Sequence, residues 1–290
     1  MTTGVTVTTG VTVITGGASG MGEAAVRLLA ARGQNVVFGD IQNDRGCALA
    51  KELGDSVAFV PTDVTAEPDV ARLIDSAVDR FGPLAGLVNN AGIIGVVGPI
   101  DTISVGDWDA TVAMLLRSVF LGMKHAARVM KPQRSGSIVN ASSIAAFRGG
   151  IGAHAYAAAK AGVSSLTVNG AAELGSFGIR VNAVAPGRIA TPMVADTWAG
   201  NHEDVEAAKD AIRGESPLAD RVGLAEDIAE AYAWLLSEAA GYVSGQVLCV
   251  DGGYIGGTPP ASVATARLAR YAGRTEFIRE AGQRGAAAPR

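Results

Sequence analysis

The stretch Val11-Thr-Val-Ile-Thr-Gly-Gly-Ala-Ser-Gly-Met-Gly22, followed by Glu23-Ala-Ala-Val-Arg-Leu-Leu29, decides the fold class of this 290-residue chain. Its first four residues, Val11–Ile14, are β-branched throughout, which is typical of a buried strand. Residues 23–29 place apolar side chains at helical spacing. The sequence therefore predicts a strand, a glycine-rich turn and a helix in immediate succession.

The glycines of this turn indicate a phosphate-binding site. Glycine tolerates positive φ and lets the backbone approach a ligand closely, as Gly16, Gly20 and Gly22 would have to do. The first-turn amides of the following helix point unpaired N–H groups at a bound pyrophosphate. A second strand-like run, Asn35–Asp40, ends in an acid 18 residues after Gly22. That carboxylate can accept hydrogen bonds from both ribose hydroxyls of an adenosine and would repel a 2′-phosphate, which favours NAD over NADP.

Strand-like runs alternate with helical patterns along most of the chain. They lie near residues 11–14, 35–39, 57–60, 85–88, 136–140, 179–184 and 246–250. This alternation predicts an α/β fold, with a single Rossmann-type, doubly wound parallel sheet of about seven strands and helices on both faces. We expect residues 1–254 to form one catalytic domain. Residues 255–290, with six arginines and two glutamates, form a C-terminal extension that either docks on a neighbouring subunit or is a disordered basic tail.

A second set of residues is suited to moving protons. Tyr156 and Lys160 are four residues apart, so on a helix they share a face. A phenol has a pKa of about 10, and a neighbouring ammonium group lowers it toward neutrality. Ser143 offers a hydroxyl that can hold a substrate oxygen while Tyr156 exchanges the proton. A tyrosine and a lysine at this spacing also occur on solvated helices. The pair therefore indicates a catalytic site only in combination with the glycine turn.

Taken in order, these motifs resemble the short-chain dehydrogenase/reductase family over about Val11 to Tyr254. The matching residues are Thr15-Gly16-x-x-x-Gly20-x-Gly22, Asp63-Val64, Asn89-Asn90-Ala91-Gly92, Ser143, Tyr156-x-x-x-Lys160 and Pro186-Gly187-Arg188-Ile189-Ala190-Thr191. The resemblance implies that Tyr156 is the catalytic acid/base, that Lys160 lowers its pKa and binds the nicotinamide ribose, and that Ser143 orients the reacting oxygen. It also implies a cofactor site made of Thr15, Gly16, Ser19, Gly20, Met21, Gly22, Asp40, Ile41, Asp63, Val64, Asn90, Ala91, Gly92, Tyr156, Lys160, Pro186, Gly187, Ile189 and Thr191.

One position departs from the family pattern. Leu115 stands where the family carries an asparagine that is thought to hold a proton-relaying water. Leucine cannot form a hydrogen bond, so the relay must be rerouted, weakened or absent. Ser118, three residues along, either holds a water instead or serves helix packing.

Composition limits the remaining function classes. The formal net charge of −4 gives no electrostatic basis for nucleic-acid binding. No apolar run approaches the roughly 20 residues that span a bilayer, and the N-terminus lacks a secretion signal, so we expect a cytoplasmic protein without membrane association. The two cysteines are too few for a disulfide framework, and Cys249 is expected to be buried. His125, His154 and His202 lack metal-ligand spacing, and His125 and His202 are expected at the surface or at helix ends.

The substrate site is expected to be apolar. A lid over about residues 192–217 begins with apolar residues and continues as a charged helix over Asn201–Arg213. The expected pocket consists of Ile144, Phe147, Arg148, Ile151, Arg188, Met193 and Trp198. Within it, Arg148 and Arg188 either clamp a carboxylate or carbonyl group or are structural. The small side chains of a helix over His154–Leu174 indicate either a homodimer or homotetramer built partly on this helix, or close packing within the chain.

These features predict an NAD-dependent oxidoreductase that interconverts a secondary alcohol and its ketone. The substrate would be a small hydrophobic molecule that is cyclic, aromatic or steroid-like, and no metal is required. Two alternatives stay open: a carbonyl reductase working in the reverse direction, and a weakly catalytic dinucleotide-binding sensor or assembly subunit. The intact Ser143, Tyr156 and Lys160 argue against the last of these.

Overall fold

The computed structural model describes residues 10–199, 201, 204–213, 217–218 and 221–256, without the side chains of residues 197–199. By its internal contacts the chain divides into a unit of residues 1–256 and a second unit of residues 257–290. The second unit, His202 and the greater part of the expected C-terminal extension lie outside the described residues.

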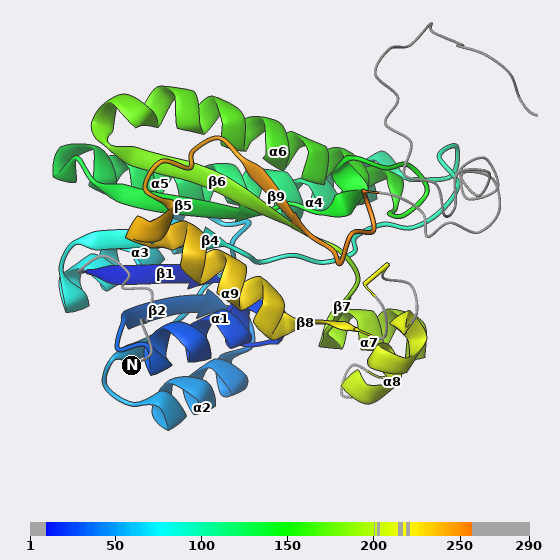
Figure 1. Ribbon diagram of the computed structural model, residues 1–290, viewed down its shortest axis with the longest axis horizontal. Coiled ribbons are helices and arrows are strands. Elements are labelled where there is room, and N and C mark those ends of the chain that lie inside the picture. Colours follow the sequence, from blue (N-terminus) through cyan, green and yellow to red (C-terminus); the bar gives the residue numbers. More distant parts are fainter. Residues whose placement is uncertain (1–9, 200, 202–203, 214–216, 219–220, 257–290) are drawn as a thin grey trace, which may run out of the picture. The chain divides into compact units, whose positions relative to one another are not determined.

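A seven-stranded parallel sheet forms the centre of the first unit (Figure 1). Its strand order is β3-β2-β1-β4-β5-β6-β9, and every neighbouring pair is parallel. The strands are β1 (Val11–Thr15), β2 (Asn35–Asp40), β3 (Val57–Pro61), β4 (Leu84–Asn89), β5 (Gly136–Ala141), β6 (Ile179–Pro186) and β9 (Val247–Val250). A separate two-stranded parallel pair consists of β7 (Ile189–Ala190) and β8 (Gly223–Leu224). The order reverses between β1 and β4, and in such sheets ligands bind at this switch point, beyond the carboxyl ends of the strands.

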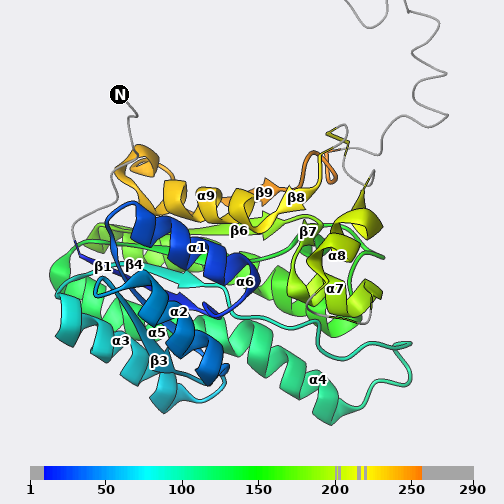
Figure 2. The ribbon, with the colours of Figure 1, turned by 90° about the horizontal axis from the view of Figure 1, so that it is seen from below.

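Helices cover both faces of the sheet (Figure 2). They are α1 (Gly20–Ala31), α2 (Asn43–Leu53), α3 (Glu67–Phe81), α4 (Val105–Val112), α5 (Ser118–Gln133), α6 (His154–Leu174), α7 (Pro192–Ala199), α8 (Val205–Ile212) and α9 (Ala225–Leu236). A π-helical turn, Ala113–Arg117, joins α4 to α5. The core on one face lies under α1, α2 and α9, and the core on the other lies under α3, α5 and α6. The sheet class, the strand positions and the bounds of α6 therefore confirm the sequence prediction.

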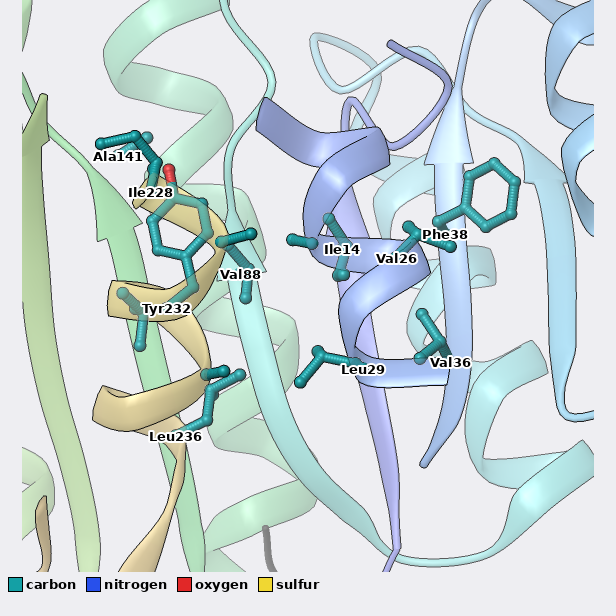
Figure 3. Packing of buried hydrophobic residues seen from close by; sticks show 14 of the residues in the cluster. Ile14, Val26, Leu29, Val36, Phe38, Val88, Ala141, Ile228, Tyr232 and Leu236 are labelled. Atoms are coloured by element: carbon teal, nitrogen blue, oxygen red, sulfur yellow. The ribbon is translucent and has the colours of Figure 1, made fainter. Parts of the chain in front are cut away.

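The fully buried first strand shows why the two cores form. Successive strand side chains point to opposite faces, so Val11 and Val13 enter one core while Ile14 enters the other. Figure 3 shows the second of these cores, where Ile14 lies among Val26, Leu29 and residues of neighbouring strands. Since both faces of β1 are buried, the strand reads as an uninterrupted apolar and β-branched run rather than an alternating one.

Two expectations about single residues were wrong. Cys249 is exposed: among the described strands β9 lies at the edge of the sheet and pairs with β6 alone, and an apolar run at an edge does not guarantee two covered faces. His125 is largely buried in the middle of α5, where its Nε2 lies 3.1 Å from Glu67 Oε1 at the start of α3. The packing of α3 against α5 covers this histidine, which sequence position alone did not reveal.

None of the helices in the described ranges combines the length and apolarity that a membrane crossing requires. Within the same residues, no group of three or more histidine, cysteine, aspartate or glutamate side chains is arranged to hold a metal ion.

Candidate active site

The glycine turn between β1 and α1 is built to admit a ligand against the backbone. Gly16 and Gly20 have φ values of +66° and +54°, which side-chain-bearing residues rarely adopt. A Cβ atom on Gly22 would lie 1.9 Å from the carbonyl oxygen of Gly16, so only glycine fits there. The turn therefore brings the first amides of α1 to the carboxyl end of β1, an arrangement that fits a pyrophosphate.

Thr15 and Asn90 join this turn to the loop that follows β4. The hydroxyl of Thr15 accepts hydrogen bonds from the backbone N–H groups of Asn90 (3.0 Å) and Ala91 (3.1 Å). In return, Asn90 Nδ2 donates to the carbonyl oxygens of Thr15 (3.1 Å) and Gly16 (3.0 Å). The structure thus places Thr15 and Asn90 where they fix the two walls of the cleft relative to each other, and the Thr15 hydroxyl is engaged within the protein.

Asp40 ends β2 beside the same turn and is almost fully buried. Its carboxylate accepts from the backbone N–H groups of Ala18 (3.0 Å) and Gln42 (3.0 Å). The side-chain amide of Gln42 lies 3.4 Å from both Asp40 Oδ1 and Ser19 Oγ. Sequence reasoning missed Gln42, because nothing in its local pattern shows that its amide reaches back to the glycine turn.

A cleft of about 300 Å³ runs along these elements. It is lined by Gly16, Ser19, Gly20, Met21, Asp40, Ile41, Gln42, Thr62, Asp63, Val64, Asn90, Ala91, Gly92, Ile93, Met114, Thr191, Pro192 and Met193. A smaller cavity of about 110 Å³ shares six of these residues and adds Ala141, Ser142, Ser143, Tyr156, Lys160, Pro186, Gly187, Ile189 and Val194. Every residue expected at the cofactor lines one of the two, except Thr15 and Gly22, which lie behind the wall.

The smaller cavity brings the three expected catalytic side chains together. Ser143 follows β5, and Tyr156 and Lys160 lie one turn apart on α6. Lys160 is buried, its Nζ donates to the carbonyl oxygen of Ala141 (2.7 Å), and it lies 5.7 Å from the centre of the Tyr156 ring. The Ser143 hydroxyl accepts from the N–H of Ala145 (3.2 Å). These groups form one constellation at the end of the cofactor-sized cleft.

Burial dominates the electrostatics of this constellation. It lowers the pKa of Lys160 to about 8, because a charged amine loses its hydration inside the protein. It raises the pKa of Tyr156, and the hydrogen bond with Ser143 opposes that rise. In the protein without its cofactor, burial therefore sets the direction of the phenol pKa, and the expected lowering of that pKa by Lys160 stays a prediction. The lysine ammonium is directed to the Ala141 carbonyl, and a buried phenol resists ionisation.

A buried polar chain supports the site from below. Asn89 Nδ2 donates to Asn140 Oδ1 (2.9 Å), and Asn140 Nδ2 donates to Thr167 Oγ1 (2.9 Å). These bonds tie the ends of β4 and β5 to the middle of α6. Sequence reasoning gave Asn140 and Thr167 no role, because a lone polar residue in a strand or helix carries no signal of its partner.

The comparisons with known proteins agree with this geometry. A family model described as Enoyl-(Acyl carrier protein) reductase matches residues 16–255. The chain is 42% identical over 244 residues to (+)-borneol dehydrogenase 2 of Salvia officinalis, covering 82% of this chain and 86% of that one. It is 44% identical over 239 residues to cis-4-hydroxycyclohexanecarboxylate dehydrogenase of Sinomonas cyclohexanicum, covering 82% and 93%. The crystal structure of levodione reductase superimposes with a TM-score of 0.79 at 37% identity, covering 87% of this chain and all of that one. The chain belongs to the short-chain dehydrogenase/reductase family.

The family's asparagine position lies in the π-helical turn between α4 and α5. Leu115 is fully buried there, and both its Cδ2 (3.5 Å) and Lys160 Nζ (3.9 Å) lie close to where a Cβ of Gly92 would stand. The Ser118 hydroxyl donates to the carbonyl oxygen of Met114 (2.5 Å). Its donor is therefore engaged within the helix, which agrees better with a packing role than with holding a water.

Of the expected substrate-side residues, Met193 lines the smaller cavity, whereas Ile144, Phe147, Arg148, Ile151 and Arg188 do not line it. Ile144 is buried, Ile151 is half-buried, and Phe147 and Met193 are exposed. Within the charged helix expected over Asn201–Arg213 the structure has α8, Val205–Ile212, and a separate helix, α7, covers Pro192–Ala199 before it. The side chain of Trp198 lies outside the described residues.

The loop after β4 supplies a wall that sequence reasoning missed. Ile93 lines both the cleft and the smaller cavity. The loop is fastened at Gly95, which has φ +74° and packs on Thr111, and at Val96, whose N–H donates to Thr111 Oγ1 (3.0 Å).

Arg148 and Arg188 both lie over the ring of Tyr254, a residue that the sequence did not connect with them. The guanidinium carbons are 5.3 Å and 6.0 Å from the ring centre. Arg188 and Tyr254 also line a cavity of about 310 Å³ that shares Ile189 with the catalytic cavity but contains none of the catalytic groups.

Proposed function

We propose that this family member is an NAD-dependent dehydrogenase that oxidises a hydrophobic, cyclic secondary alcohol to its ketone. Relatives of this chain are named for alcohols and ketones, which makes the chain an oxidoreductase of that kind. The observation that carries the proposal is that Ser143, Tyr156 and Lys160 line one cavity at the end of a cleft shaped for a dinucleotide.

The cavity supplies the proton chemistry. Ser143 donates a hydrogen bond to the alcohol oxygen, Tyr156 accepts the hydroxyl proton, and Lys160 provides positive charge beside the phenol. NAD held in the cleft beside Gly20, Asp40 and Asn90 would supply the hydride acceptor and a positive charge that favours the phenolate. Because burial raises the pKa of Tyr156, these positive charges are needed for the phenol to act as a base near neutral pH.

The test is NADH formation, followed by absorbance, with purified protein and a panel of borneol, cyclohexanol and 4-hydroxycyclohexanecarboxylate. We expect wild-type turnover on at least one alcohol and a loss of at least 1000-fold in the Tyr156→Phe variant, with NADH binding near normal. Substantial residual activity in that variant would remove Tyr156 from the proposed role.

The preference for NAD rests on Asp40. Its buried carboxylate lines the cleft beside the turn and would repel a 2′-phosphate. Asp40→Ala should lower kcat/KM for NAD about tenfold and raise it for NADP, with the melting temperature measured to exclude misfolding. A wild type that already prefers NADP contradicts the assignment.

We further propose a cytoplasmic homodimer or homotetramer with a lid over about residues 192–217. Two readings compete with the dehydrogenase. A carbonyl reductase uses the same groups in reverse, and the ratio of kcat/KM values in the two directions separates it. A weakly catalytic sensor is favoured only by Leu115, and it predicts NADH binding without turnover on any alcohol or ketone.

A further inference from the structure

Tyr232 on α9 is the largest side chain that the described part of the chain buries completely. Its ring belongs to the same core as Ile14 and Val88, near the carboxyl ends of β1 and β4 (Figure 3). Helix α9 packs along α1, the helix that follows the glycine turn. Figure 3 shows the hydroxyl oxygen of Tyr232 directed toward the end of the sheet at which Ala141 lies, and Ala141 lines the catalytic cavity.

The hydroxyl group of Tyr232 needs a reason beyond the filling of space. A phenylalanine ring would fill nearly the same volume, and a hydroxyl group removed from water destabilises the fold unless it forms a hydrogen bond. The Tyr232 hydroxyl donates to Asn90 Oδ1 (3.4 Å), and among the described residues it is the one donor to that oxygen. The buried phenol therefore contacts a residue that lines both the cofactor-sized cleft and the catalytic cavity.

Asn90 carries this contact to the glycine turn. Its Nδ2 donates to the carbonyl oxygens of Thr15 (3.1 Å) and Gly16 (3.0 Å), and a Cβ atom on Gly22 would lie 2.6 Å from the same nitrogen. An asparagine amide has its acceptor and its donors on different arms, so one orientation of the side chain serves both sets of bonds. The amide is thus held between Tyr232 on one side and the glycine turn on the other.

Tyr232 stays a donor while the catalytic cavity exchanges protons. Burial raises the pKa of Tyr232, and the phenol of Tyr156 raises it further. An ionised Tyr156 opposes a second negative charge close by, because like charges repel. The hydrogen bond to Asn90 is therefore available whether Tyr156 is protonated or ionised.

We propose that Tyr232 is a positioning residue of the cofactor site, whose hydroxyl holds the Asn90 amide and, through it, the glycine turn in the conformation that receives a dinucleotide. Tyr232 lines neither the cleft nor the catalytic cavity, so it acts through Asn90. The inference rests on the proposed function in that the cleft binds a nicotinamide dinucleotide. Without the hydroxyl, the turn occupies other conformations for part of the time, and the apparent dissociation constant rises by the inverse of the competent fraction.

The test is a calorimetric titration of NADH into wild type and into Tyr232→Phe, which keeps the ring and loses the hydroxyl. The NADH dissociation constant should rise about three- to tenfold, the range expected when one hydrogen bond is lost. On the best alcohol at saturating NAD, kcat should change less than about twofold, because the residue affects binding and not the chemical step. An unchanged dissociation constant overturns the inference, whatever happens to the melting temperature.

Ser137→Ala is the matched control for the loss of a buried hydroxyl. Ser137 Oγ also forms a buried hydrogen bond to α9, with the carbonyl oxygen of Leu235 (3.1 Å), but it lies at the start of β5, away from the carboxyl ends of the strands. The control should lower the melting temperature and leave NADH affinity unchanged. If it weakens NADH binding as much as Tyr232→Phe does, general loosening explains both variants and the inference falls.

A second measurement asks whether the effect passes through Asn90. In the Asn90→Ala background, which lacks the acceptor, Tyr232→Phe should weaken NADH binding by less than about a further twofold. A full additional loss in that background means that Tyr232 acts by another route, and it overturns the inference. Where Asn90→Ala does not fold, the titration of Tyr232→Phe against its control decides alone.

The same titrations with NADPH separate this inference from the proposed function. The ratio of variant to wild-type dissociation constants should be the same as with NADH, because the glycine turn receives the pyrophosphate that both nucleotides share. A wild type that prefers NADPH contradicts the assignment of Asp40 alone. Absence of turnover with every alcohol and ketone overturns the proposed dehydrogenase, while the titrations still decide the role of Tyr232.

Discussion

At the scale of single residues, the buried amine of Lys160 couples the active site to stability. Its pKa is lowered from 10.5 to about 8. Below pH 8 the amine is charged in both the folded and the unfolded chain, and the folded state carries the full desolvation cost. Between pH 8 and 10.5 the folded protein has lost this proton while the unfolded chain still holds it. The contribution of Lys160 to stability therefore rises with pH across this window, by about 3 kcal/mol at most.

Urea unfolding at pH 7, 8, 9 and 10 of the Tyr156→Phe variant and of the Tyr156→Phe/Lys160→Met double variant measures this effect. The Tyr156→Phe change is present in both proteins so that the phenol does not titrate in the same range. Above pH 8, we expect the free energy of unfolding of the protein with Lys160 to rise steadily relative to that of the protein with methionine at this position. A difference in unfolding free energy that stays flat between pH 7 and 10 would show that Lys160 keeps an ordinary pKa in the folded state.

Leu115 is the residue whose replacement should improve the enzyme. Leu115 and Lys160 Nζ approach the same point beside Gly92, so an asparagine amide there can reach the polar side of the cavity. Leu115→Asn should raise kcat a few-fold without changing the affinity for NAD, because a relay acts on proton transfer and not on binding. Leu115→Met, which conserves volume without adding a hydrogen-bonding group, is the control. Unchanged turnover in the asparagine variant would mean that proton exchange does not depend on this position.

At the scale of elements, the β1–α1 turn is the most demanding junction. Gly22→Ala would place a methyl group 1.9 Å from the Gly16 carbonyl oxygen. The turn must then open, so we expect at least tenfold weaker NADH binding and a stability loss of about 1–3 kcal/mol. Gly175→Ala is the matched control, because that residue has helical φ and ψ and open space around its Cβ position. The control should be slightly more stable than wild type, by about 0.5–1 kcal/mol. Normal NADH affinity in Gly22→Ala, measured by fluorescence titration, would show that the turn tolerates a side chain.

The elements themselves could be predicted from the sequence wherever both faces or one stripe are buried. Strand β1 is recognisable as an uninterrupted β-branched run, and helix α6 is recognisable from its many alanines between His154 and Leu174. The π-helical turn at Leu115 could not be predicted, because a one-residue change in hydrogen-bond register leaves no compositional trace. The predicted burial of Cys249 was wrong for a related reason, because an edge strand and a central strand can have the same local sequence pattern.

At the scale of the whole molecule, the spacing of residues in the sequence predicts some contacts of the candidate site and not others. Tyr156 and Lys160 share helix α6, and Ser143 follows strand β5, the strand before it, so the topology brings them together. The stack of Arg148 on Tyr254 joins segments from different strand ends, and no local pattern links them. The sign of the Tyr156 pKa shift was also beyond the sequence, because desolvation depends on every element that closes the cavity.

Assembly is the remaining property of the whole molecule that the structure makes testable. Helix α6 packs Ala155 and Ala159 within the chain, and Gly162 meets Leu116. Its opposite side exposes a stripe at helical spacing, formed by Ala158, Ala161, Ser165, Val168 and Ala172. The small side chains on the buried side of α6 allow close packing within the chain. The exposed stripe on its other side is available to pack against the same helix of a second subunit.

Val168→Lys tests that surface, because a charge at a helix–helix contact cannot be buried without a partner. Val168 is half exposed in the single chain, so the substitution should cost less than 0.5 kcal/mol of stability within it. Light scattering after size exclusion should give wild type a multiple of 29.3 kDa and the variant half that mass or less. Val105→Lys, at an exposed apolar residue that begins α4, is the control and should leave the mass unchanged. A wild type that runs as a single chain, or a variant with wild-type mass, would show that α6 does not form the subunit contact.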